Sequence, residues 1–184
     1  MLKCTSCRQG SLTPGYLDML FPCHTCDHCG GNWVLLKDYL RWKEANPDYQ
    51  FEQATIEVEA EDSKLAMTCP QTGKLMVKYR ISKDTDHRLD LSPDVHGIWL
   101  DKGEWELLKQ AGLAGNLNAI FTDPWQRKIR EANAKEVFEQ LYKEQFGDDD
   151  YQKIKQTRDW LSQHPKRRDL IAYLVADDPY SANR

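Results

Sequence analysis

Four cysteines near the start of the chain stand in two pairs, Cys4-x-x-Cys7 and Cys26-x-x-Cys29. A pair at this spacing forms a tight turn that directs both sulfur atoms at one ion, so two pairs supply the four thiolates of a tetrahedral Zn²⁺ site. Two glycines follow Cys29, and glycine reaches the positive φ that turns backbone amides towards the sulfurs. We therefore expect one structural Zn²⁺ bound by Cys4, Cys7, Cys26 and Cys29.

Other assignments of these thiols remain open. Cys23 forms a further pair with Cys26 at the same spacing, and His24 and His28 are close enough in sequence to compete as ligands. Only Cys29 is followed by glycines and then by Trp33, which favours the Cys26–Cys29 pair. Cys23 is then predicted to be a small, half-buried strand residue, and the two histidines are predicted to be solvated.

A disulfide or a redox dithiol would be an alternative use of paired cysteines. The N-terminal residues carry no apolar signal segment, and no stretch is apolar for long enough to span a bilayer. We therefore expect a cytoplasmic chain without membrane association, in which thiols stay reduced and paired cysteines favour a metal.

Composition limits the classes of function. The 184 residues are 40% hydrophobic and 29% charged, with a formal net charge of −4. This balance is typical of a soluble globular protein and gives no support for a polyanion-binding face, so duplex DNA is not an expected partner. The basic run Lys166–Arg168 is more simply a solvated segment before a helix.

The chain also contains an internal repeat. Gly31-Asn32-Trp33-Val34 matches Gly97-Ile98-Trp99-Leu100, and the helix that follows carries Asp38-Tyr39 in one copy and Glu104-Trp105 in the other. Upstream, Cys69 aligns with Cys4 one residue out of step. The other three ligand positions of the second copy hold Thr72, Ser92 and Val95, and one thiolate cannot hold structural zinc. The second copy is therefore predicted to keep the shape without the metal.

These residues resemble the bacterial zinc-finger family named after the ribbon of transcription factor IIB. The first copy carries the resemblance through its four paired cysteines, Gly30, Gly31 and Trp33, and the second through Cys69-Pro70, Gly97-Ile98-Trp99-Leu100-Asp101 and Gly103-Glu104. The resemblance covers roughly the first 110 residues. It implies a small zinc-ribbon fold and, by the family's name, a link to transcription, although a shared fold does not imply a shared function.

The elements that must position these residues follow from periodicity and stop signals. Strands are expected at 17–21, 55–60, 75–80 and 88–91, and helices at 34–45 and 102–110. After Pro124 the pattern is helical up to Gly147; a second helix follows Asp148–Asp150, and a short one carries Leu170 to Leu174. These helices are expected to form a core of their own. The predicted fold class is α+β, with regions 1–48 (zinc ribbon), 49–115 (metal-free ribbon-like copy) and 116–184 (helical).

Catalytic chemistry is not indicated. No Ser/His/Asp order, phosphate-binding glycine loop or His-Glu-x-x-His sequence stands out, and a zinc with four thiolates has no open position for substrate. We therefore expect a non-enzyme that works as a protein-interaction adaptor. The adaptor role is motivated by a set of aromatic residues, some of which would be exposed for contacts, although core packing is the simpler interpretation of each tryptophan taken singly. They are Trp33, Tyr39, Trp42, Trp99 and Trp105. The alternatives are a transcription-associated factor contacting RNA polymerase or nucleic acid, and a thiol redox or zinc sensor that uses Cys23.

Overall fold

The computed structural model describes residues 2–52, 60 and 65–181. It divides into two compact units, 1–132 and 133–184, which are described separately. The predicted α+β class is confirmed. The predicted strand at 55–60 lies, apart from Ala60, outside the described residues. Among those that are described, no helix combines the length and the apolar character needed to cross a membrane.

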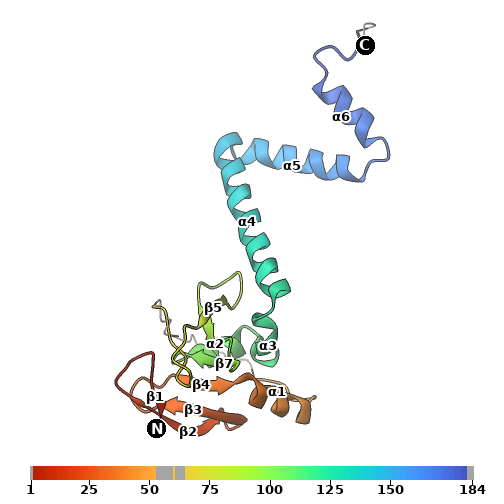
Figure 1. Cartoon of the computed structure of the whole chain (residues 1–184). Helices are drawn as coiled ribbons and strands as arrows, with labels where there is room; N and C mark the ends of the chain where they lie inside the picture. Colours follow the sequence, from red (N-terminus) through yellow and green to blue (C-terminus); the bar gives the residue numbers. More distant parts are fainter. Residues whose placement is uncertain (1, 53–59, 61–64, 182–184) are drawn as a thin grey trace. The chain divides into compact units, whose positions relative to one another are not determined.

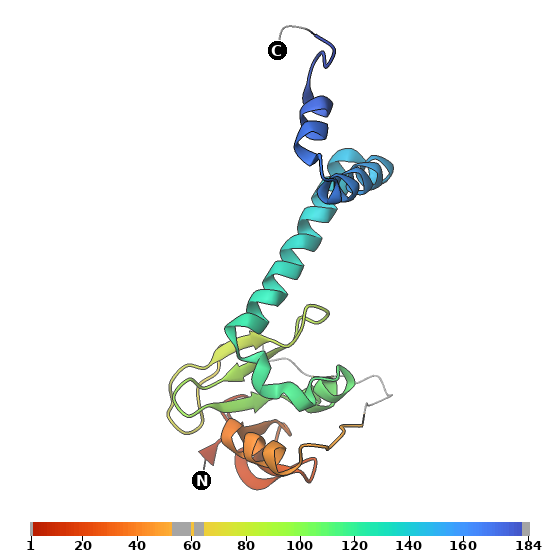
Figure 2. The same cartoon turned by 90° about the vertical axis from the view of Figure 1, so that its right-hand side faces the viewer.

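Unit 1 is built on a seven-stranded antiparallel sheet with the order β1-β2-β3-β4-β7-β6-β5 (Figure 1). The strands of the first copy are β1 (Leu2–Lys3), β2 (Ser11–Leu17), β3 (Phe21–Cys26) and β4 (Asn32–Leu35). Those of the second copy are β5 (Val77–Arg80), β6 (Arg88–Leu91) and β7 (Gly97–Leu100). Both views show the two copies side by side (Figures 1 and 2).

The two copies are joined by direct pairing of β4 with β7. Trp33 lies opposite Trp99, and Val34 lies opposite Ile98. The repeat is therefore arranged about a local two-fold axis near the two tryptophans. This pairing explains why unit 1 contains both predicted ribbon regions and the first turns of the long helix α4 (Asp123–Phe146). The regions predicted from the sequence were instead divided after residues 48 and 115.

Successive side chains of the central strands point to opposite faces of the sheet, and both faces are apolar. One face carries Trp33 and Trp99, packed with Cys4, Cys26, Cys69 and the buried Met67 and Met76. The opposite face carries Val34, Ile98 and Leu100 and is covered by Tyr39, Trp105 and Leu108 from the helices. The zinc ligands and the helices thus lie on opposite faces of one sheet.

Four helical segments complete unit 1: α1 (Leu36–Ala45), α2 (Glu104–Gln110), the 3₁₀ turn η1 (Ala114–Asn116) and α3 (Leu117–Ile120). The long helix α4 (Asp123–Phe146) begins in unit 1 with Pro124 in its first turn, where a missing N–H costs nothing. Gln126 donates from its side chain to the carbonyls of Arg80 and Ile120, which fixes the start of α4 to the second ribbon.

The strand predicted at 17–21 is wrong. Leu17 ends β2 and Phe21 begins β3, and the residues between them form the hairpin turn, where Asp18 and Met19 adopt φ of 51° and 60°. The apolar character of Leu17, Leu20 and Phe21 suggested a strand, but it reflects packing of the turn onto the helix-covered face.

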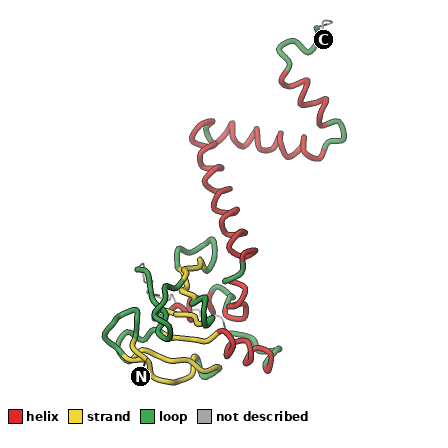
Figure 3. Tube along the Cα trace, viewed as in Figure 1, coloured by secondary structure: helices red, strands yellow, loops and turns green. Residues whose placement is uncertain are grey.

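Unit 2 holds the rest of α4, then α5 (Asp148–Gln163) and α6 (Arg167–Val175), joined by short loops (Figure 3). Gly147, at φ 80°, separates α4 from α5 as predicted. The expected helical core is not present. Of the apolar side chains described in this unit, only Tyr151 and Leu161 are buried.

Candidate metal centre

The four predicted ligands converge at one end of the first ribbon. The sulfur atoms of Cys4, Cys7, Cys26 and Cys29 all lie within 4.8 Å of one another. The Sγ–Sγ distance is 3.8 Å for Cys4 and Cys29 and 3.7 Å for Cys7 and Cys26. A tetrahedral Zn²⁺ with Zn–S bonds of about 2.3 Å places its sulfurs about 3.8 Å apart, so this cluster has the dimensions of a zinc site.

Backbone amides surround the sulfur atoms, as tight turns of this kind require. Gly10 donates its N–H to Cys7 Sγ at 3.4 Å, and the amides of His28 and Cys29 donate to Cys26 Sγ at 3.5 Å. Gly30 has the positive φ predicted for it, 72°. The amide of Gly10 stabilises the thiolate of Cys7 over its thiol, which favours metal binding.

Sequence reasoning missed Gly10. A methyl group at this position would collide with Cys26 Sγ and lie 2.7 Å from Asp27 Oδ1 and 2.8 Å from the Cβ of His28. Gly10 therefore lets the two halves of the site approach each other. The signal in the sequence was a glycine three residues after Cys7, the second ligand, where the turn around the metal closes.

The thiols of the site differ in acidity. Burial raises the pKa of Cys4 to about 11 and also raises that of Cys29. Burial would raise the pKa of Cys7 as well, but the amides of Gly10 and Gln9 outweigh it and lower the pKa to about 6. Zinc must therefore displace protons from at least Cys4 and Cys29, because only thiolates bind the metal.

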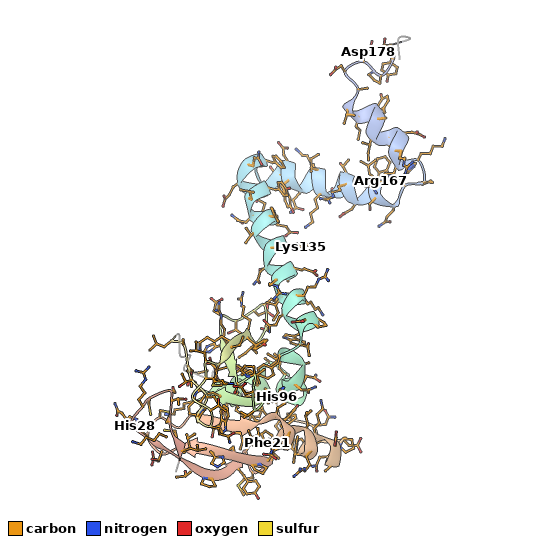
Figure 4. The ribbon with its side chains drawn as sticks, viewed as in Figure 1. Phe21, His28, His96, Lys135, Arg167 and Asp178 are labelled. Atoms are coloured by element: carbon orange, nitrogen blue, oxygen red, sulfur yellow. The ribbon has the colours of Figure 1, made fainter. Side chains whose placement is uncertain are left out.

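Cys23 does not join the cluster. It lies on β3 with its side chain on the helix-covered face, whereas Cys26 lies on the opposite face. It is 4% exposed, more buried than predicted, and burial raises its pKa. His24 and His28 are likewise outside the one group of candidate ligands found among the described residues. Phe21 begins β3 and His28 follows the end of this strand, and Figure 4 shows the two residues well apart.

The second copy keeps the turns of a metal site without its ligands. Cys26 N–H donates to Gly31 O and Gly30 N–H donates to Cys26 O; in the second copy the same bonds run from Ser92 to Gly97 and from His96 to Ser92. All four turns contain a residue of positive φ after the second ligand position: Arg8, Gly30, Gly73 and His96. The predicted retention of shape is thus visible in the backbone.

Cys69 lies in this second set of turns and is 1% exposed. Burial would raise its pKa, but the Ser92 and Thr72 hydroxyls outweigh that effect and lower it. Hydroxyls thus face Cys69 where the first copy has thiolates.

The two copies interlock through their glycines and tryptophans. A methyl group at Gly31 would collide with the ring of Trp99, and one at Gly97 would collide with the ring of Trp33. Both rings are fully buried, as core packing predicts for each tryptophan taken singly, so neither is available to a partner. Tyr39 and Trp105 are buried as well, and Trp42 is partly buried.

Asp101 connects the second copy to the metal site of the first. It accepts hydrogen bonds from Trp99 Nε1 at 2.7 Å and from the hydroxyl of Ser6 at 3.3 Å, and Ser6 lies between two zinc ligands. Glu104 accepts from the backbone N–H of Asp101 at 2.8 Å. These contacts give a physical role to the Asp-x-Gly-Glu ending of the repeat.

A closed set of four thiolates in two tight turns, set in a small antiparallel sheet, defines a structural zinc ribbon. Residues 3–45 match the family described as transcription factor zinc-finger, the ribbon of transcription factor IIB. The match confirms the resemblance inferred for the first copy and identifies Zn²⁺ as the ion of the four-cysteine site. Neither a curated protein nor a solved structure matches the chain.

Proposed function

We propose that this zinc-binding protein is a non-enzymatic adaptor that binds another protein through an apolar groove on unit 1. The groove has a volume of about 550 Å³ and is lined by the loop 81–85, the end of α2 and the first turns of α4. We call it the α2–α4 groove. Its apolar lining consists of Ile81, Leu107, Ala111, Leu113, Trp125, Ile129 and Ala132.

The walls of this groove are held in place by the ribbon. Trp125 Nε1 donates to the carbonyl of Ile81 at 3.0 Å, and Ile81 itself is fully buried. A largely pre-formed groove that is apolar along α2 and α4 and polar along the loop 82–85 is suited to bind an amphipathic peptide or helix at little cost in ordering. This groove is the observation that carries the proposal.

The zinc supports the adaptor role rather than catalysis. Its four protein thiolates leave no position for water or substrate, so the metal's contribution is to fold the sheet. The sheet in turn carries β5, and the loop 81–85 that follows β5 forms one wall of the groove. In this proposal zinc acts on binding through the scaffold.

Site-specific photo-crosslinking in the native host tests the proposal. A photoreactive residue at Ala111, which is exposed in the groove, should capture one defined protein, and the same residue at the exposed Tyr16 of β2 should not. Ala111→Arg fills the groove and should abolish capture by a probe at Gln110, whereas Tyr16→Arg should preserve it. Equal capture in both variants would refute the groove as the binding site.

A second candidate, contact with the transcription machinery, is supported by the description of the family that residues 3–45 match. The net charge of −4 favours contact with polymerase protein over contact with DNA. Fluorescence anisotropy with duplex DNA over a range of salt concentrations separates the two. Sequence-preferring binding at physiological salt would favour the nucleic-acid role.

The sensor alternative finds little support, because Cys23 is buried on the face opposite the metal. A thiol that exchanges with zinc ligands must reach them, and a reactive thiol has a lowered pKa. Cys23 meets neither condition.

A further inference from the structure

We propose that the helices of unit 2 form an interface between two copies of this chain, with the groove between α4 and α5 at its centre. This proposal concerns a different surface from the α2–α4 groove and does not rest on the adaptor function.

The first observation is the amount of apolar surface that unit 2 leaves exposed. Twelve large apolar side chains are more than a third exposed: Val137, Phe138, Leu141, Tyr142, Phe146, Ile154, Trp160, Ile171, Tyr173, Leu174, Val175 and Tyr180. Single exposed apolar residues are ordinary, but such a number in one small unit marks an interaction surface. A segment of about 50 residues that buries two apolar side chains also lacks the core that independent stability requires.

The second observation is a groove between two of these helices. It has a volume of about 590 Å³ and is lined by Phe138, Tyr142 and Phe146 of α4 and by Tyr151 and Ile154 of α5. We call it the α4–α5 groove. The rings of Tyr142 and Phe146 stack at 5.7 Å with an angle of 13°, and Lys155 binds Glu139 at 3.1 Å across the two helices. The stacked rings belong to α4, and the Lys155–Glu139 ion pair joins α4 to α5 beside the groove, which an apolar helix face would fill.

The charges indicate what fills it. Residues 133–184 contain nine Lys and Arg and ten Asp and Glu, and the groove itself is lined by both signs, including Glu139, Lys155 and Arg158. Polyanions and anionic lipid surfaces attract a predominantly basic face, which this unit does not have. A near-neutral surface of mixed sign is complementary to another surface of the same kind.

The order of charges along α5 favours a second copy in particular. Asp148, Asp149 and Asp150 occupy its first turn, and Lys153, Lys155 and Arg158 follow in the next two turns. Lys153 and Lys155 are ion-paired within the chain with Asp150 and Glu139, so the attraction between two copies rests on Asp148 and Arg158. Two such helices attract each other when antiparallel, because the acidic end of one then lies against the basic part of the other. A two-fold axis perpendicular to the helices produces this arrangement, and closed two-fold pairing is the commonest form of self-association.

Sedimentation equilibrium of the full zinc-loaded chain tests the proposal. We expect a mass of twice the 21.4 kDa chain at micromolar concentration. Phe138→Glu places a charge in the groove and should weaken self-association at least about 30-fold, as expected for a central interface residue. Leu75→Glu is the matched control, since Leu75 is 66% exposed, belongs to unit 1 and does not line the groove.

Complementary charge reversals identify the partner as a second copy in antiparallel orientation. Asp148→Lys and Arg158→Glu should each weaken self-association roughly tenfold, because two related contacts per dimer become repulsive. An equimolar mixture of the two variants should restore the dimer, which also shows that both variants are folded. A monomeric wild-type chain at 100 µM (about the highest concentration of the assay), or a dimer that Phe138→Glu leaves intact, would overturn the proposal.

Discussion

Gly97→Ala tests the interlock between the two ribbons. A methyl group at Gly97 would lie 2.8 Å from Cε2 of Trp33 and closer still to Cζ2 and Cη2. Ordinary van der Waals contact begins at 3.4 Å, so Cε2 alone would have to move by roughly 0.6 Å. Trp33 is fully buried in the central strand pair, so its ring has no free space to enter.

The expected cost is about 3 kcal/mol in the free energy of unfolding. Overpacking a tight core costs about 1–3 kcal/mol, and the upper value applies here because both the ring and the backbone strand are fixed. Urea unfolding of the zinc-loaded protein, followed by tryptophan fluorescence, measures the change. Such a loss is a large part of the roughly 5–15 kcal/mol that stabilises a typical domain.

Gly15→Ala is the control for the general effect of adding a methyl group to a strand glycine. No atom lies within 4 Å of a methyl group at Gly15. This variant should stay within about 1 kcal/mol of wild type and can be slightly more stable, because alanine restricts the unfolded chain. If Gly97→Ala differs from Gly15→Ala by less than about 0.5 kcal/mol, the two ribbons are not interlocked as we describe.

Three further predictions concern the metal. Gly10→Ala should weaken zinc binding at least tenfold in competition with a chromophoric chelator, because its methyl group strikes Cys26 Sγ; unchanged affinity would show that the turn can relax. Zinc affinity should rise with pH, with log K gaining at least about two units per pH unit between pH 7 and 8, since Cys4 and Cys29 have raised pKa values and must lose their protons; a slope below one would contradict this assignment. Chelation should expose the backbone amides of β7 as well as those of β4 to hydrogen exchange, because the two strands share a core; continued protection of 97–100 would mean that the second ribbon folds alone.

The metal ligands could be predicted from sequence because their geometry is local. Each pair of cysteines is fixed by one tight turn, and spacing alone defines such a turn. The strand at 88–91 was predicted with the bounds that the structure gives to β6, since its residues and those of the preceding segment form an ordinary hairpin. Repeat alignment also placed Thr72, Ser92 and Val95 at the ligand positions, which the retained turns support.

The central strand pair could not be predicted in this way. β4 and β7 are separated by more than sixty residues, and each is only four residues long. Gly31 was predicted, with Gly30, to be a turn residue of positive φ, but its φ is not positive, and its small size is needed because the ring of Trp99 covers it. A contact between distant copies leaves no local pattern, so glycine chosen for close packing and glycine chosen for a turn look alike in one sequence.

The joined sheet explains how a ribbon without metal can persist in this chain. One zinc fixes the turns that end β3 and begin β4, and β4 pairs directly with β7. The free energy of zinc binding therefore stabilises strands of both copies, since the metal binds only the folded sheet. In return, the second copy supplies Trp99 and Asp101, which contact Gly31 and Ser6 in the first. Three thiolates are absent from the second copy, whereas its residues at the junction make specific contacts. We infer that the junction, rather than a second metal, is what the second ribbon contributes to the fold.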